Sequence, residues 1–173
     1  MSPFEIPDGH RLLGAEAISE PLAAVASLAT ADVPWALGWA TVELDRAEAE
    51  LRQAFAQFGA GAATEATDDD LLGARCRLVS FGGGSFQVAL LEPSTEGRLA
   101  ASLVRYGEGF VAAYAPLADL DRVGTSSGLL LSAEADGPFG RQRLVLGGPA
   151  WGAHLLLTAA DRAAAPGAAT IRS

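Results

Sequence analysis

The side chain best suited to acid–base chemistry is His154, one of 2 histidines in the sequence. It lies in the apolar run GAHLLLTA (152–159), which is typical of a buried strand. A neutral imidazole there can take up or release a proton near neutral pH, whereas a hydrogen-bonded core histidine is the alternative interpretation. The other histidine, His10, lies close to the N-terminus. We therefore treat His154 as a catalytic candidate that acts without a second histidine.

Tyr114 is the second catalytic candidate, because its phenol can donate a hydrogen bond to a ligand carbonyl. It lies in GEGFVAAYAPLADLD (107–121), where Ala112 and Ala113 occupy the middle of an apolar strand. Gln87, in the strand-like run SFQVALLEP (85–93), offers an amide that can orient a ligand. Packing with a satisfied polar group is the alternative interpretation for Tyr114 and for Gln87.

Other chemically suggestive residues are better explained by structure than by a site. Cys76 is the single cysteine, which excludes a disulfide framework, and we expect it to pack in the core. The segment 82–85 (GGGS) joins two strand-like runs, so it predicts a hairpin turn rather than a phosphate-binding loop. We expect Asp68 to Asp70 to form a solvated loop.

Composition limits the class of protein and its partners. The chain has 173 residues, 50% of them hydrophobic and 19% charged, so it can form one domain with a buried core. A net charge of −9 argues against a nucleic-acid partner. No apolar run approaches the roughly 18 residues of a membrane span, and we see no secretory signal. We therefore expect a cytoplasmic protein without a membrane or nucleic-acid partner.

These residues are positioned by a repeated series of elements. A β-prone run at 37–44 precedes a helix that Asp45 caps, and β-prone runs follow at 62–67, 74–81 and 85–93. The same order recurs at 110–117, in a short helix opened by Asp119, and at 128–135, 141–148 and 152–159. Two successive strand–helix–strand–strand–strand units predict an α+β fold of two tandem βαβββ modules.

The predicted domain boundaries follow this repeat. Residues 1–35 form an N-terminal arm with a short helix, and residues 161–173 form a flexible C-terminal tail. Between them, residues 36–160 form one domain made of the modules 36–93 and 109–160.

The repeat resembles the vicinal oxygen chelate (VOC) superfamily, which includes glyoxalase I, methylmalonyl-CoA epimerase, extradiol dioxygenases and antibiotic-binding resistance proteins. VALLEPSTEGRLAASLVRYGEGFVAAYAPLADLD (88–121) and GPAWGAHLLL (148–157) are similar to the glyoxalase and epimerase-like branch. The resemblance covers roughly residues 36–158. It implies two curled sheets that enclose a cleft, in which His, Gln or Glu side chains hold one divalent metal ion.

The positions that the resemblance assigns to the metal ligands carry no donor side chain. They are Gly38 (or Ala36 with a two-residue shift), Ala89, Ala112 and Leu156. We therefore expect no metal ion and no other cofactor. Because side chains alternate along a strand, residues two positions from these sites are expected to line the same cleft. The residues expected to bind a ligand are Trp39, Thr41, Glu43, Gln87, Phe110, Ala112, Trp151 and Leu156.

Two classes of function fit this cleft. The first is a metal-independent isomerase, lyase or cyclase of small-molecule metabolism, in which His154 and Tyr114 are catalytic. The second is a binding protein that sequesters a small molecule without turnover, as resistance members of the superfamily do, with aromatic side chains stacked on a planar ligand. A degenerate partner subunit, retained for dimerisation, is a third possibility.

We predict a homodimer, because related proteins complete the cleft across a two-fold interface and curled sheets leave edges that need covering. Light scattering at micromolar concentrations measures the molar mass directly. A mass of 17.7 kDa, that of one chain, would contradict this prediction.

Overall fold

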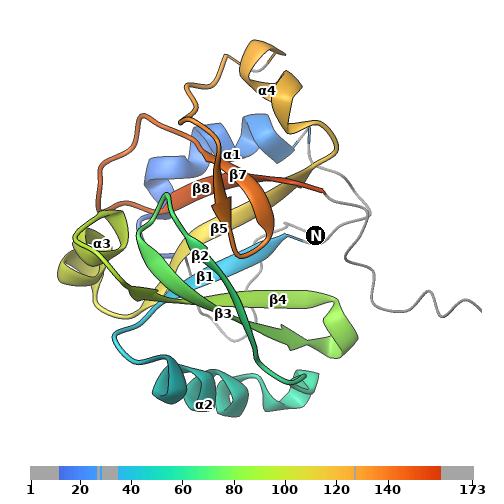
Figure 1. Ribbon diagram of the computed structural model, residues 1–173, viewed down its shortest axis with the longest axis vertical. Helices are drawn as coiled ribbons and strands as arrows, with labels where there is room; N and C mark the ends of the chain where they lie inside the picture. Colours follow the sequence, from blue (N-terminus) through green and yellow to red (C-terminus); the bar gives the residue numbers. More distant parts are fainter. Residues whose placement is uncertain (1–11, 27, 29–34, 127, 161–173) are drawn as a thin grey trace, which may run out of the picture.

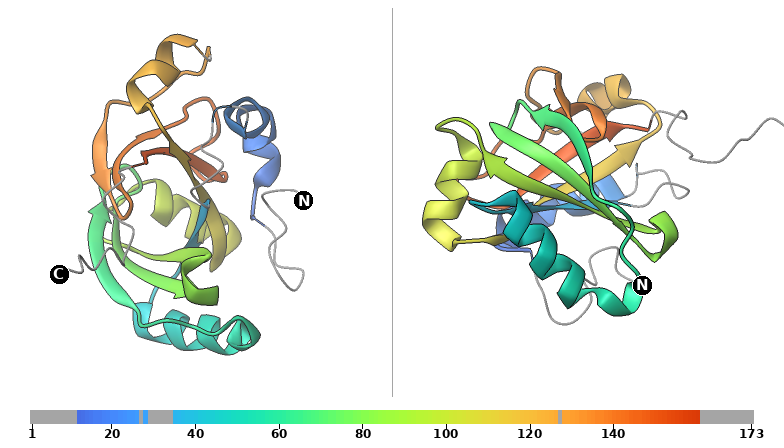
Figure 2. Two further views of the ribbon diagram at one scale, coloured as in Figure 1. Left: turned by 90° about the vertical axis from the view of Figure 1, so that its right-hand side faces the viewer. Right: turned by 60° about the horizontal axis from the view of Figure 1, so that its bottom comes forward.

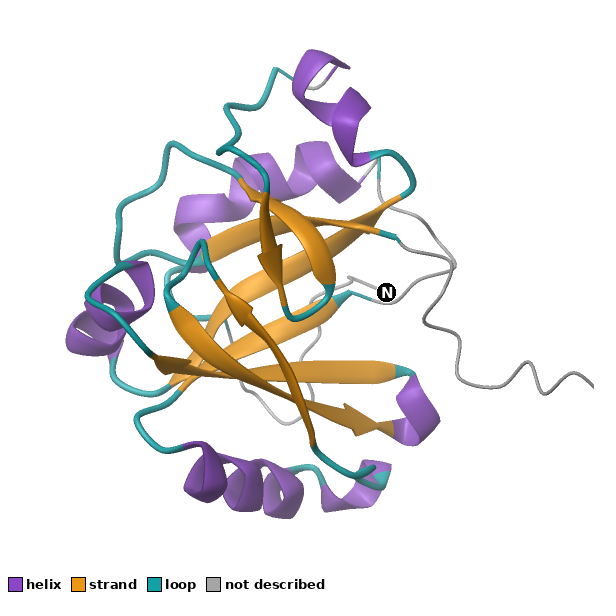
Figure 3. Cartoon of the chain, in the orientation of Figure 1, coloured by secondary structure: helices purple, strands orange, loops and turns teal. Residues whose placement is uncertain are grey.

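The computed structural model describes residues 12–26, 28, 35–126 and 128–160. The strands of this part of the chain form one eight-stranded sheet with the order β2-β3-β4-β1-β5-β8-β7-β6, and the helices lie around it (Figures 1 and 3). This arrangement confirms the predicted α+β fold of two tandem βαβββ modules.

The first module follows the predicted order of elements. It consists of β1 (Ala36–Ala40), α2 (Leu44–Ala54), β2 (Thr64–Asp69), β3 (Ala74–Phe81) and β4 (Phe86–Pro93). The helix begins earlier than predicted, since Glu43 rather than Asp45 is its N-cap residue. The physical reason is a tight turn after β1, where Thr41 Oγ1 accepts a hydrogen bond of 3.1 Å from the Glu43 N–H.

The second module follows a linking helix, α3 (Arg98–Tyr106), and repeats the order. It consists of β5 (Gly109–Leu117), α4 (Leu120–Ser126), β6 (Ala135–Gly137), β7 (Gly140–Leu144) and β8 (His154–Ala159). The strand predicted at 128–135 is wrong in its limits, because β6 begins only at its last residue. Residues 130–132 instead form separate backbone hydrogen bonds to the end of β7 and the chain after it, with Leu146 N donating to Leu130 O at 2.8 Å.

The N-terminal arm contains a 3-10 helix (Ala15–Ile18) followed by α1 (Ser19–Ala26). Ile18 and Val25 are buried and pack against the sheet, which anchors this part of the arm. The predicted C-terminal tail, residues 161–173, lies outside the described residues, as does His10. None of the described helices is long and apolar enough to cross a membrane.

The two modules meet through their first strands. β1 pairs in parallel with β4 of its own module and antiparallel with β5 of the other module. At the far edges, the Asp70 N–H in the turn after β2 donates a hydrogen bond of 3.3 Å to the Asp136 carbonyl oxygen of β6. The sheet therefore curls until its two edges meet, as Figure 2 shows.

Side chains pack on both faces of this curled sheet. On the outer face, α1, α2 and α4 cover a cluster that includes Leu51, Phe55, Val88, Phe110 and Leu155. On the inner face, a second cluster, here called the interior cluster, includes Leu72, Leu91, Tyr114, Leu144 and Leu156. Because both faces are buried, β5 reads as a continuous apolar run instead of an alternating one.

A β-bulge in β5 changes which residues face the interior. Gly38 of β1 lies opposite Ala112, but the next residue, Trp39, lies opposite Phe110. The extra residue, Val111, therefore reverses the alternation, and Phe110 packs on the outer face with Trp39. The expectation that Phe110 shares a face with Ala112 is wrong for this reason.

The interior is packed too tightly at Gly38 for any side chain. A Cβ atom added there would lie 2.8 Å from Ala112 Cβ and 2.8 Å from a methyl group of Leu91. We predict that Gly38→Ala lowers the free energy of unfolding by about 1–3 kcal/mol, because overpacking displaces neighbouring atoms. Urea denaturation measures this cost.

The matched control is the same substitution in an Ala112→Gly background, which removes one of the two close contacts. There the cost of Gly38→Ala should be smaller, and the difference is the coupling energy of the pair. An equal cost in both backgrounds would contradict the packing described here.

Candidate functional site

The structure brings three of the four positions that correspond to metal ligands into direct contact. Gly38 on β1 lies opposite Ala89 on β4 and Ala112 on β5. Leu156 on β8 lies opposite Tyr114, two residues further along β5. The side chains of Ala89, Ala112 and Leu156 belong to the interior cluster and are inaccessible to solvent. The register predicted for these positions is thus consistent with one common location.

Tyr114 fills that location. Its ring lies 3.2 Å from the position that a Gly38 Cβ would occupy, and its side chain is 1% exposed. It also contacts Phe139 edge to face, with ring centroids 4.9 Å apart. The hydroxyl group donates a hydrogen bond of 2.9 Å to Asp69 Oδ2. The expected cleft between the modules is therefore occupied by the protein's own side chains.

Asp69 is the polar centre of the interior. It is completely buried at the end of β2, so the expectation of a solvated acidic loop is wrong for this residue. Its Oδ1 accepts hydrogen bonds from the Leu71 and Leu72 N–H groups at 3.1 and 2.9 Å. Burial raises the pKa of Asp69, while these hydrogen bonds and those from Tyr114 and Gln142 act in the opposite direction. Such bonding compensates for the cost of burying a carboxyl group.

The residues at this location do not fit a divalent metal ion. Gly38, Ala89, Ala112 and Leu156 have no donor atoms, and Asp69 already accepts hydrogen bonds at both oxygen atoms. Among the residues that the structure describes, His, Cys, Asp and Glu side chains form no group of three that can hold a metal. Tight binding needs several N or O donors converging at about 2.0–2.6 Å.

Cys76 points into the same interior and has no activating base. Its thiol lies 3.6 Å from the Ala74 carbonyl oxygen, and burial raises its pKa to about 12. The thiol is therefore protonated at neutral pH and packs as a small apolar group, as predicted.

His154 lies at the start of β8 and is 3% exposed. Its Nε2 lies 3.1 Å from the Ser102 hydroxyl group on α3, and that hydroxyl lies 3.0 Å from the Arg98 carbonyl oxygen. If the hydroxyl donates to the carbonyl, Nε2 carries the imidazole proton and Nδ1 is free to accept one. Burial, together with the positive charge of Arg98, lowers the pKa of His154 to about 4. The imidazole is therefore neutral at pH 7.

A polar cavity of about 280 Å³ borders His154. Its walls come from the arm (residues 16–21), the first residue of α3 (Arg98), the loop after β7 (residues 145–149) and the start of β8. Tyr114 is not among the residues that line it. The two catalytic candidates from the sequence thus belong to different environments, Tyr114 to the packed interior and His154 to the wall of a cavity.

Two of the predicted ligand-binding residues instead belong to a network around Arg46 and Glu108. Thr41 Oγ1 donates a hydrogen bond of 2.7 Å to Glu108, and Arg46 Nη2 contacts both carboxylate oxygens of Glu108 at 2.7 and 2.8 Å. Glu43, as N-cap residue of α2, lies 3.6 Å from Arg46. Burial disfavours ionisation of Glu108, but the hydrogen bonds from Arg46 and Thr41 outweigh it and lower its pKa to about 2. Thr41 and Glu43 thus serve a structural ion-pair network.

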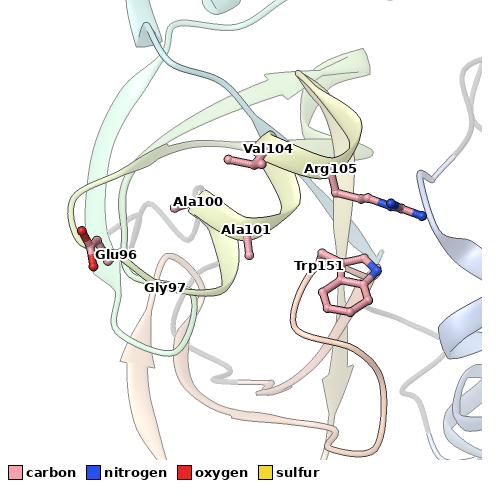
Figure 4. Close-up of a pocket in the computed structure, with 7 residues that line it drawn as sticks. All are labelled: Glu96, Gly97, Ala100, Ala101, Val104, Arg105 and Trp151. Atoms are coloured by element: carbon pink, nitrogen blue, oxygen red, sulfur yellow. The ribbon is translucent and has the colours of Figure 1, made fainter.

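The remaining predicted residues are dispersed. Trp39 and Phe110 stack edge to face on the outer layer, with ring centroids 4.9 Å apart. Gln87 is half-buried, and its amide lies 3.3 Å from the Ser80 hydroxyl group. Trp151 is 46% exposed and lies against the outer side of α3, where it borders a groove of about 640 Å³ (Figure 4). The structure does not bring these side chains together with His154.

Sequence reasoning missed three residues that define the polar sites. Asp69 lies within a run of acidic residues that gives no sign of its burial. Ser102 and Arg98 lie on the helix that links the modules, and only the fold brings them to His154. Their spacing of four residues, one helical turn, places them on the same side of α3. This spacing is the only feature of the sequence that indicates that Arg98 and Ser102 lie close together.

Solved structures with the same fold include methylmalonyl-CoA epimerases. The enzyme from Mycobacterium tuberculosis is 25% identical, with a TM-score of 0.59 over 71% of this chain and 84% of the other. A Streptomyces coelicolor methylmalonyl-CoA epimerase, in complex with 2-nitronate-propionyl-CoA, is 22% identical, with a TM-score of 0.55 over 71% and 93% of the two chains. A hypothetical protein from Bacillus halodurans is 16% identical, with a TM-score of 0.54 over 71% and 90%.

Neither a family model nor a curated protein matches the sequence. The structural similarities confirm the resemblance to the VOC superfamily and to its glyoxalase and methylmalonyl-CoA epimerase-like branch.

The lowered pKa of His154 predicts a specific dependence of stability on pH. The folded protein binds this proton more weakly than the unfolded chain, so the stabilisation is complete above pH 6.5 and is lost as the pH falls towards about 4. Between pH 8 and pH 5 the contribution of His154 is about 2 kcal/mol. We predict that His154→Gln removes this part of the slope.

Urea denaturation of both proteins at pH 8 and pH 5 tests the prediction. Gln87→Ala, a substitution away from the imidazole, should keep the slope of the unchanged protein. Equal slopes for the unchanged protein and His154→Gln would contradict the assignment of a buried neutral imidazole.

Proposed function

We propose that the protein binds a small organic molecule in the cavity beside His154 and moves a proton on it without a metal ion, as an isomerase or lyase does. His154 takes a proton from a carbon atom of the ligand, the electron pair stays on the ligand, and the proton is returned at the end of the reaction. Such a cycle needs no oxidant and no second substrate. The site lies beside the expected cleft rather than in it, because Tyr114 and its neighbours fill the cleft.

One observation carries this proposal: the imidazole that borders the cavity is neutral and held in one orientation. The Ser102 hydroxyl group lies 3.1 Å from Nε2 and restrains the ring, which leaves Nδ1 as the nitrogen for proton transfer. A histidine with only a packing role is expected to be surrounded by protein, whereas His154 borders a polar cavity. Here the cavity also includes a cation, Arg98, that can orient a ligand.

The comparisons support the same class of reaction. Several of the similar solved structures are methylmalonyl-CoA epimerases, and an epimerase is an isomerase. The fold is shared, but the donor set that a metal needs is missing at Gly38, Ala89, Ala112 and Leu156. We propose that acid–base chemistry by a side chain replaces Lewis-acid chemistry in this chain.

Sequestration without turnover is the alternative function, and the fate of the ligand separates the two. Native mass spectrometry of protein purified without added ligand identifies the molecule that occupies the cavity. That molecule is then offered to the unchanged protein and to His154→Gln. We predict conversion by the unchanged protein and a loss of roughly 10²–10⁴-fold in turnover for the variant.

Two further variants sharpen this test. Ser102→Ala keeps the imidazole but frees its orientation, so it should lower kcat less than His154→Gln does. Trp151→Ala, on the outer groove, should keep full activity. Binding of the ligand without any product in the unchanged protein would contradict the enzymatic proposal and favour sequestration.

A further inference from the structure

Arg98 is a half-buried cation without a partner among the described residues. It forms no ion pair and no side-chain hydrogen bond there, although its backbone carbonyl accepts the Ser102 hydroxyl. Other arginines of the described chain behave differently: Arg46 and Arg77, for example, each contact carboxylates within 3.0 Å. A half-buried guanidinium group that no carboxylate pairs is available to bind an anion.

The surroundings of Arg98 are suited to an anion. The imidazole of His154 is neutral at pH 7, so it does not repel the nearby guanidinium group of Arg98. It also carries no negative charge that would compete with a ligand anion for that group. Gly147 and Gly148 also line the cavity, and their N–H groups donate to no acceptor within the described chain. A guanidinium group and free backbone N–H groups are the donors that proteins use for carboxylates and phosphates.

We propose that this cavity binds the carboxylate group of a small organic monocarboxylic acid, with Arg98 as its charged partner. The inference rests on the proposed function for the place of the ligand, and it adds the chemical class of that ligand. A guanidinium group and a carboxylate form two parallel hydrogen bonds, which fixes the orientation of the acid as well as its charge.

Size and charge favour a small acid with one negative charge. The volume of about 280 Å³ lies at the lower limit of ordinary ligand pockets, which hold roughly 300–1,000 Å³. Glu16 and Glu20 of the arm are exposed and border the same cavity. Their charges disfavour a second negative group on the ligand, whereas Arg98 neutralises one. A phosphate dianion therefore fits less well than a carboxylate.

Binding at Arg98 would also prepare His154 for catalysis. The positive charge of Arg98 is one of the two causes that lower the pKa of His154. A carboxylate on Arg98 cancels that charge, so the pKa of His154 rises towards its ordinary value and the imidazole becomes a stronger base. The base thus gains strength only while an acid occupies the cavity.

Proton NMR of the full chain tests the proposal with propionate as the probe. The chain has 2 histidines, so the imidazole signals of His154 can be assigned by comparison with His154→Gln. At pH 8, propionate should shift the His154 signals in a saturable manner, and propionamide, its neutral analogue, should not. Propionate should also raise the pKa of His154 in an NMR titration.

The matched pair of variants is Arg98→Gln and Arg105→Gln, on the same helix. Arg105 borders the outer groove beside Trp151 and not this cavity, so Arg105→Gln should bind propionate as the unchanged protein does (Figure 4). Arg98→Gln should weaken binding roughly tenfold or more, the usual effect of losing a charged hydrogen-bond partner. Thermal unfolding confirms that both variants are folded.

Several results would overturn the proposal. They are equal shifts by propionate and propionamide, unchanged affinity in Arg98→Gln, the absence of saturation, and tighter binding of inorganic phosphate than of propionate. Its failure can be separated from that of the proposed function. Turnover that depends on His154 but not on Arg98 would refute the carboxylate site alone. Propionate binding that depends on Arg98, in a protein without turnover, would refute the catalytic proposal alone.

Discussion

The hydrogen bond between Tyr114 and Asp69 determines how the two halves of this molecule fit together. Tyr114 lies on the first strand of the second module, and Asp69 lies at the end of the second strand of the first module. The ring can enter the interior only because Gly38 and Ala112 leave space for it. Its hydroxyl group can remain there only because Asp69 accepts its hydrogen bond, since an unpaired phenol in an apolar core is costly.

The same interaction explains where chemistry can take place. In the VOC fold, the space between the modules is where the family's metal and substrate are expected to meet. Here an aromatic ring, aliphatic side chains and one satisfied carboxyl group occupy it. A polar cavity remains at the margin, where the linking helix α3 meets the start of β8. We propose that the ligand binds in this cavity instead of between the modules, and that the imidazole of His154 and the guanidinium group of Arg98 act on it in place of a metal ion.

The fold could be predicted from the sequence because the same order of strands and helix occurs twice in it. Each module presents the same order of apolar runs and turn residues, so an error in one element does not change the topology. The strand predicted at 128–135 illustrates this point: its limits were wrong, yet the module was recognised. Similarly, Ala89, Ala112 and Gly38 were placed together correctly, since alignment of whole strands fixes their register.

The site was harder to predict because it depends on single residues. One extra residue, Val111, turns Phe110 to the outer face, and the sequence does not show a β-bulge in a strand that is apolar on both sides. Asp69 is buried, although its neighbours Asp68 and Asp70 are exposed. Arg98 and Ser102 reach His154 from a distant helix. Long-range contacts of this kind appear only when the chain is folded.

Side chains of the protein occupy the place where the family's metal ion is expected, and metal analysis examines this directly. The protein is incubated with zinc, nickel, manganese or cobalt, dialysed, and analysed for bound metal per chain. We predict no stoichiometric metal, and no change in ligand affinity or turnover after treatment with a chelator. About one equivalent of any of these ions retained through dialysis would show that the interior does hold a metal ion, although Gly38, Ala89, Ala112 and Leu156 offer no donor atoms for it.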